Sequence, residues 1–62
     1  MYTATISYPR NPEQGIESQV GKSAEEAKAL ALAVSAVNVS RRLTVYDGDY
    51  CMVQDTLIRP RR

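Results

Sequence analysis

Histidine and tryptophan are absent from this chain of 62 residues, and it has a single cysteine, Cys51. Without histidine, no imidazole is available as a general base or metal ligand. One cysteine forms no internal disulfide, and the three glycines are too scattered for a phosphate-binding loop. These absences remove the residues on which common catalytic and metal sites depend, so we expect no enzyme, no cofactor and no bound metal.

The shortness of the chain predicts one domain, residues 1–58, followed by a basic tail, residues 59–62. A domain near this size buries only about 60% of the surface that its unfolded chain exposes, so its stability depends on a small core. A lone thiol suits a reducing compartment. No leader pattern opens the sequence and no apolar run approaches membrane-spanning length. We therefore expect a cytoplasmic protein with no membrane partner.

The net charge of +1 is too small to argue for nucleic-acid binding by itself. Its distribution is uneven: residues 1–40 hold three basic and four acidic side chains, whereas residues 41–62 hold five arginines and three aspartates. Arginine makes bidentate contacts to carboxylates and phosphates and stacks on aromatic rings, which suits interfaces. Exposed charge is also simply solvated surface in most proteins, so both interpretations stay open.

Period-two alternation from Tyr2 to Tyr8 predicts a half-buried strand, with Thr3, Thr5 and Ser7 on its polar side. Two prolines and a glycine in residues 9–15 end it. A weaker alternation in residues 16–20 predicts a short edge strand, in which Ile16, Ser18 and Val20 share one side.

Residues 23–26, Ser-Ala-Glu-Glu, form a capping box in which the Ser23 hydroxyl accepts the Glu26 N–H and the Glu26 carboxylate reaches back to the Ser23 N–H. The alanine- and leucine-rich segment that follows predicts a helix to about Asn38. The helical period predicts that one face covers the sheet: Ala27, Leu30, Ala31, Val34 and Val37. Leu32 and Val39 then lie near the polar side, where they suggest a homodimer contact.

Residues 43–53 predict a hairpin that turns at Asp47-Gly48. A two-residue loop places Leu43 opposite Met52 and Val45 opposite Tyr50, all on the core face. A three-residue loop pairs Tyr46 with Tyr50 instead and turns Cys51 and Val53 inward, so the register stays open.

Together these elements predict an α+β fold, β-β-α-β-β, with a four-stranded antiparallel sheet in the order 2-1-3-4 and one helix packed on one face. The other face carries Arg42, Thr44 and Tyr46 beside the polar side of the first strand, and nothing remains to cover it. Asp47-Gly48-Asp49 lacks the further ligands of a calcium loop, and Cys51 lacks a histidine base, so we interpret them as a turn and a small apolar residue.

The residues that remain for function are tyrosines and arginines, which are enriched at interface hot spots. We expect a partner to contact Arg41, Arg42, Tyr46 and Tyr50, with electrostatic support from Arg59, Arg61 and Arg62. Nucleic acid is the alternative partner, although an RNA-binding sheet stacks bases on two or three aromatics and only Tyr46 is well placed here.

The opening strand (2–8), the capped helix (23–38) and the closing hairpin (43–53) resemble small phage-encoded anti-CRISPR proteins that inhibit type I surveillance complexes. The resemblance is one of size, element order and helix opening. It implies a stoichiometric inhibitor that occupies a Cas subunit surface and blocks target DNA binding. The slightly positive chain departs from the strongly acidic DNA mimics among those proteins. The helix opening also resembles HicB-type antitoxin domains, whose proline-and-glycine loop before the helix is missing here.

The resulting expectation is a small protein-binding inhibitor whose partner is a larger host protein or ribonucleoprotein complex. The alternative is a small nucleic-acid-binding or HicB-like antitoxin domain that uses the same arginines on phosphates.

Overall fold

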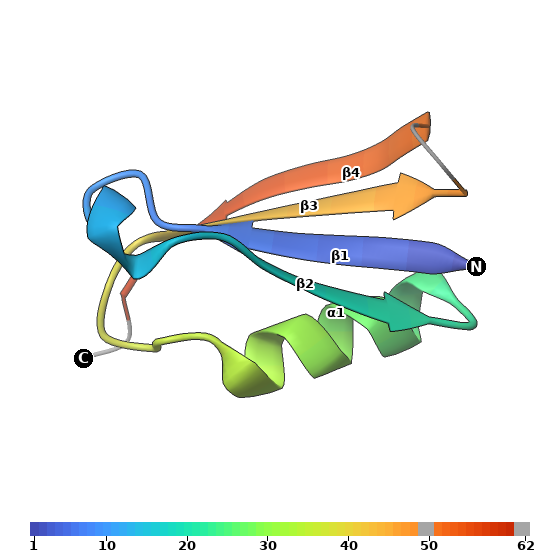
Figure 1. Ribbon diagram of the computed structural model, residues 1–62, viewed down its shortest axis with the longest axis horizontal. Coiled ribbons are helices and arrows are strands. Elements are labelled where there is room, and N and C mark those ends of the chain that lie inside the picture. Colours follow the sequence, from blue (N-terminus) through green and yellow to red (C-terminus); the bar gives the residue numbers. More distant parts are fainter. Residues whose placement is uncertain (49–50, 61–62) are drawn as a thin grey trace.

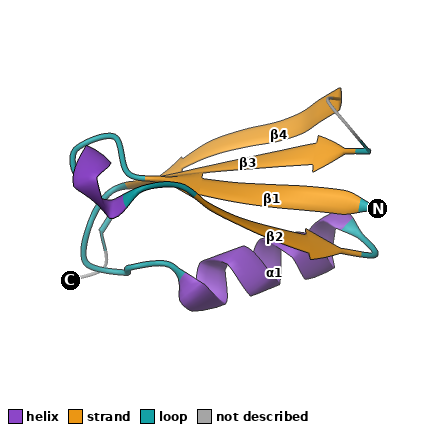
Figure 2. Cartoon of the chain, viewed as in Figure 1, coloured by secondary structure: helices purple, strands orange, loops and turns teal. Residues whose placement is uncertain are grey.

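The computed structural model describes residues 1–48 and 51–60. Its elements are, in order, β1 (Tyr2–Ser7), the 3-10 turn η1 (Pro12–Gln14), β2 (Glu17–Gly21), α1 (Ala24–Val34), β3 (Arg41–Asp47) and β4 (Cys51–Ile58). The four strands form one antiparallel sheet in the order β2-β1-β3-β4, and α1 packs on one face of it (Figures 1 and 2). The predicted α+β fold and strand order are confirmed.

The core lies between α1 and the two central strands. Its buried side chains come from alternate positions of β1 and β3, from Tyr8 directly after β1, and from α1, as the period-two pattern of a strand with one covered face requires: Ala4, Ile6, Tyr8, Ala27, Ala31, Leu43 and Val45. Among the described residues, Ile6 and Val45 are the largest side chains that are fully buried. This core is small, so each contact between α1 and the sheet matters for stability.

The helix begins as the capping box predicts and ends earlier than predicted. The Ser23 hydroxyl accepts a hydrogen bond from the Glu26 N–H at 3.1 Å. The Glu26 carboxylate accepts from the Lys22 N–H, one residue before the predicted donor. At the other end, α1 stops at Val34, because Ser35 has extended backbone angles and both its N–H and its hydroxyl donate to the Leu32 carbonyl. The predicted end near Asn38 is therefore wrong.

The face of α1 that covers the sheet is rotated relative to the prediction. Ala27 and Ala31 are buried as expected, but three predicted core residues are exposed: Leu30, Val34 and Val37. The prediction of exposed side chains at Leu32 and Val39 is wrong, since both pack against the core. The physical reason is that α1 meets the sheet through alanines, next to Gly21 in β2, so the helix lies close and its larger apolar residues flank the contact.

The β3–β4 hairpin adopts neither predicted register. Asp47 pairs with Cys51, so the loop spans residues 48–50, and Gly48 has a φ of 68° that glycine adopts without strain. A bulge follows: Tyr46 pairs with Met52 and Val45 with Gln54, which leaves Val53 as the extra residue. Met52 is thus on the face away from α1, not in the core as predicted. The predicted placement of Tyr50 falls outside the described residues.

Strand β4 runs to Ile58, beyond the predicted end at Val53. The extension adds a full edge strand beside β3. Helix α1 has 11 residues, and no helix within the described ranges has the length and apolar character needed to cross a bilayer.

Candidate protein-docking face

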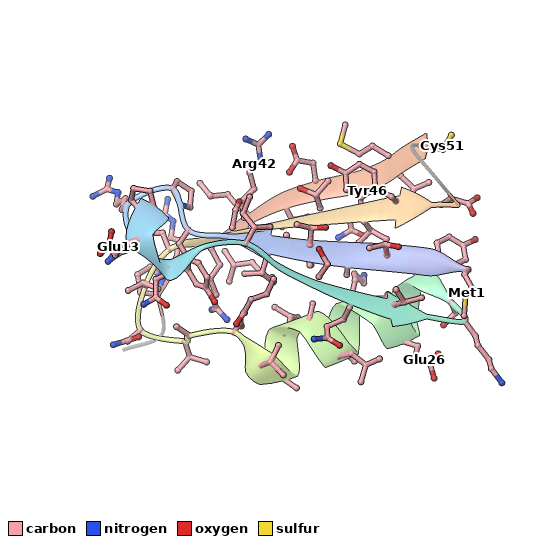
Figure 3. All side chains as sticks on the ribbon, viewed as in Figure 1. Met1, Glu13, Glu26, Arg42, Tyr46 and Cys51 are labelled. Atoms are coloured by element: carbon pink, nitrogen blue, oxygen red, sulfur yellow. The ribbon has the colours of Figure 1, made fainter. Side chains whose placement is uncertain are left out.

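The sheet face that points away from α1, called the open face below, carries two of the seven predicted contact residues, Arg42 and Tyr46. Across β1 and β3, Thr3 pairs with Tyr46, Thr5 with Thr44, and Ser7 with Arg42, as expected from the predicted strand order. Cross-strand partners share a face, so β2 and β4 extend it with Ser18, Val20, Met52, Asp55 and Leu57. Figure 3 shows Arg42 and Tyr46 projecting away from the helix. Within residues 1–48 and 51–60, no helix or strand covers this face (Figure 1).

An ion pair between β3 and β4 occupies the open face. Arg42 donates to both oxygens of Asp55, with Nε–Oδ1 at 2.9 Å and Nη2–Oδ2 at 2.5 Å. The Thr44 hydroxyl donates to Asp55 Oδ1 at 3.3 Å. The pKa of Asp55 is lowered from its ordinary value, chiefly by the hydrogen bond from Arg42 and also by the charge of Arg42 and the hydroxyl of Thr44. The Asp55 carboxylate in turn raises the pKa of Arg42. The pair fixes the guanidinium in a bidentate geometry at the surface.

Apolar side chains lie on both sides of this ion pair. On the β4 side, Leu57 is 67% exposed and Met52 is 58% exposed. On the β2 side, Val20 is 50% exposed, and Ile16, which directly precedes β2, is 72% exposed. Between them runs a strip of hydroxyl groups in which the Thr5 and Ser18 side chains lie 3.3 Å apart. The open face therefore combines exposed apolar side chains with an ion pair and a strip of hydroxyl groups.

Arg41 lies apart from the open face. Its residue is only 6% exposed, because the strand alternation that turns Arg42 outward turns Arg41 toward the end of α1. Its Nη1 donates to the Ser35 hydroxyl at 3.0 Å and its Nη2 to the Arg59 carbonyl at 3.5 Å, while its buried Nε has no partner. A cation beside the last turn of a helix is favourable. Arg41 therefore has a structural explanation that the sequence pattern did not suggest.

The end of the molecule near η1 holds two adjacent depressions that share Pro9. One, of about 320 Å³, is lined by Ser7, Pro12, Ile16 and Arg42 among others. The second, of about 440 Å³, is lined by Arg10, Ser40, Leu57, Arg59 and Pro60. Arg59, predicted as electrostatic support, is thus placed at the edge of the open face. Two other predicted supports, Arg61 and Arg62, lie outside the described residues, as does the predicted contact Tyr50.

Several open-face residues were not assigned a role from the sequence. Asp55 is the most important of these, because the hairpin was predicted to end at Val53 and the partner of Arg42 therefore went unnoticed. Residues 54–58, Gln-Asp-Thr-Leu-Ile, show no period-two alternation of polar and apolar side chains, so the sequence pattern carried no signal for this part of β4. In the part of the chain that is described, no three histidine, cysteine, aspartate or glutamate side chains lie close enough to hold a metal ion.

These features define a small α+β protein with one helix-covered sheet face and one open face that carries an arginine–aspartate pair between apolar side chains. Comparison with protein-family models, with curated proteins and with solved structures finds no match for this chain.

Proposed function

We propose that this chain is a small, non-enzymatic inhibitor that binds a larger protein through its open face. The observation that carries the proposal is the absence of any described element over that face, where a preorganised Arg42–Asp55 pair lies between exposed apolar side chains. Arginine and tyrosine at the centre of an apolar patch are the side chains that contribute most to protein–protein affinity. We assign Arg42 and Tyr46 as the central contacts.

The state of Arg42 favours a protein partner over a nucleic acid. The Arg42 guanidinium already donates hydrogen bonds to both oxygens of Asp55. A phosphate would therefore have to displace Asp55 or bind beside the negative charge of Asp55. Tyr46 is the one aromatic side chain that the described strands place on the open face, and sheets that bind RNA stack bases on two or three. A protein surface can instead use the Arg42–Asp55 pair as one unit that accepts and donates hydrogen bonds.

At the level of the partner, we propose a phage-type inhibitor of a CRISPR surveillance complex, which occupies a Cas surface and blocks target DNA binding. The support for this step is the resemblance in size and element order to small anti-CRISPR proteins. The net charge of +1 argues against mimicry of DNA and for direct contact with a Cas protein.

The test is target DNA binding by a purified type I surveillance complex, measured by mobility shift with and without this protein. We expect the wild-type protein to suppress the mobility shift. The Tyr46→Ala variant should need about tenfold or more higher concentration for the same suppression, the usual effect of truncating a hot-spot residue. Val37→Ala is the matched control, because Val37 is exposed beyond the helix and away from the open face. Failure of wild type to bind the complex would refute the proposed partner, and equal effects of both variants would refute the proposed face.

Direct nucleic-acid binding is the second candidate, and the exposed arginines Arg10 and Arg59 at one depression favour it. Phosphate contacts release counterions, so such binding weakens steeply between low and moderate salt. A protein interface built around apolar contacts persists over the same range. A partner recovered only from lysate that has not been treated with nuclease would favour this second candidate.

A further inference from the structure

We propose that the depression between Pro9-Arg10 and Arg59-Pro60 receives carboxylate side chains from an acidic segment of the protein partner. This inference rests on the proposed function and specifies the chemistry of the partner. The depression lies beside the open face, since Leu57 belongs to both and the neighbouring depression reaches Arg42. A partner that contacts Arg42 and Leu57 is therefore close enough to contact Arg10 and Arg59 as well.

The two arginines that line this depression are free to bind an anion. Arg10 and Arg59 are exposed, and neither has a carboxylate within 4.0 Å among the residues that the structure describes. Arg42, in contrast, is already paired with Asp55. The Ser40 side chain lines the same depression, and a serine hydroxyl can donate a third hydrogen bond. Two guanidinium groups and a hydroxyl form a donor set suited to a carboxylate.

Arg41 adds positive charge behind this donor set. Its guanidinium is buried, its Nη2 contacts the Arg59 carbonyl, and its Nε has no hydrogen-bond partner among the described residues. No acidic side chain in the described ranges forms an ion pair with it. An uncompensated charge in a poorly solvated position contributes more to the local potential than an exposed one. The depression should therefore attract anions more strongly than Arg10 and Arg59 would alone.

The surroundings of the depression favour an acidic protein segment over a phosphate backbone. Pro9, Pro60 and Leu57 contribute apolar walls, which a peptide can contact and a sugar–phosphate chain cannot use as well. The nearest aromatic residue, Tyr8, is only 4% exposed, and its hydroxyl already contacts Glu17 and the Ala36 N–H. No base-stacking surface is therefore supplied there by the described residues.

Acidic residues of the chain itself also lie toward this end: Glu17 accepts a hydrogen bond from the Tyr8 hydroxyl, and Glu13 belongs to η1. Glu13 lies in η1 (Figure 3) next to Pro12, which lines the first depression, and it forms no ion pair with any residue in the described ranges. Its charge opposes an incoming carboxylate. Removing that charge should strengthen anion binding, which provides a gain-of-affinity variant that misfolding cannot mimic.

The experiment is an NMR titration of the full chain with a short synthetic peptide of aspartate, glutamate and leucine, followed through backbone amides and arginine Nε–Hε signals. Two probes are compared with it: the same peptide with amide side chains, and a single-stranded oligothymidylate. We expect the acidic peptide to bind with a dissociation constant of about 1 mM or lower and to shift the signals of Arg10, Ser40 and Arg59. The amide peptide should leave them unchanged.

The variants separate this site from general electrostatics. Arg59→Glu should lower the affinity for the acidic peptide by at least about tenfold, as expected for loss of a charged hydrogen bond. Lys22→Glu makes the same charge change at the opposite end and should have a much smaller effect, while Glu13→Gln should tighten binding. The proposal is overturned if the peptide shifts none of these signals, if Lys22→Glu weakens it equally, or if the oligothymidylate binds these residues more tightly. If only the peptide fails and the surveillance complex still responds to Tyr46→Ala, the inference fails while the proposed function stands.

Discussion

At the scale of single residues, two adjacent arginines have opposite roles. Strand β3 alternates, so Arg42 points to the open face and pairs with Asp55, whereas Arg41 points inward and contacts Ser35 and the Arg59 carbonyl. Alternation along the strand places Arg41 on the face opposite Arg42, but the sequence does not reveal its partners. These depend on where α1 ends, because Ser35 directly follows the helix.

The first prediction concerns Arg41. Replacing it with alanine removes its bonds to Ser35 and Arg59 and its packing at the end of α1, so Arg41→Ala should lower the free energy of unfolding by about 1–3 kcal/mol. Urea denaturation measures the change. Arg10→Ala, an exposed control, should stay within about 0.5 kcal/mol of wild type. If Arg41→Ala is as stable as wild type, the buried guanidinium is not structural.

The second prediction concerns the pH dependence of stability. Because the pKa of Asp55 is lowered in the folded state by its hydrogen bond to Arg42, its stabilising contribution is present above the unfolded pKa and disappears as the pH falls through the folded pKa. The stability difference between wild type and Asp55→Asn should therefore be constant above about pH 5 and shrink below it. Denaturation across this range measures it.

The Arg42→Gln background provides the control for that prediction. Without Arg42, the largest cause of the lowered pKa is lost, so Asp55→Asn should then produce a much smaller pH-dependent difference. An unchanged pH dependence in this background would show that another group is responsible.

At the scale of elements, the contact between α1 and β2 decides the orientation of the helix. A Cβ atom on Gly21 would lie 2.6 Å from the Ala27 nitrogen, so the backbones of β2 and α1 approach as closely as glycine and alanine allow. Sequence periodicity identified the helix and its cap, because both depend on local spacing. It misjudged the covered face, because small residues, not the largest apolar ones, made the closest contact.

The third prediction follows from this close approach. Gly21→Ala must displace backbone atoms of α1, since the atoms in its way are not flexible side chains, and it should lower the free energy of unfolding by about 1–3 kcal/mol. Gly15→Ala is the control: it has open space and a positive φ, so its cost is backbone strain alone, about 1 kcal/mol. The amide signal of Ala27 should move in the first variant and stay in the second. A stable Gly21→Ala protein with an unmoved Ala27 signal would contradict the close packing.

The β3–β4 hairpin shows a second limit of sequence reasoning. The Asp47-Gly48 pair located the turn correctly, but the loop length and the bulge at Val53 set the register. Because one residue of slip exchanges the two faces of a strand, Met52 was predicted on the wrong side. The open face on β1 and β3 was predicted well, since it depends only on alternation within long, regular strands.

At the scale of the whole molecule, one helix is too little to cover both faces of a four-stranded sheet. Two surfaces with apolar side chains result: the open face, and an outer strip at α1 formed by Leu30, Val34 and Val37. They differ in chemistry, because only the open face combines apolar residues with the Arg42–Asp55 pair and Tyr46. We assign docking to the open face, and the outer strip stays exposed to solvent in the complex.

The most direct test of this assignment is hydroxyl-radical footprinting of the protein alone and bound to its partner, with side-chain oxidation read by mass spectrometry. The account predicts that Tyr46, Met52 and Leu57 become protected in the complex, while Leu30, Val34 and Val37 keep the reactivity of the free protein. Protection of the α1 strip with no change at Tyr46, Met52 and Leu57 would contradict it.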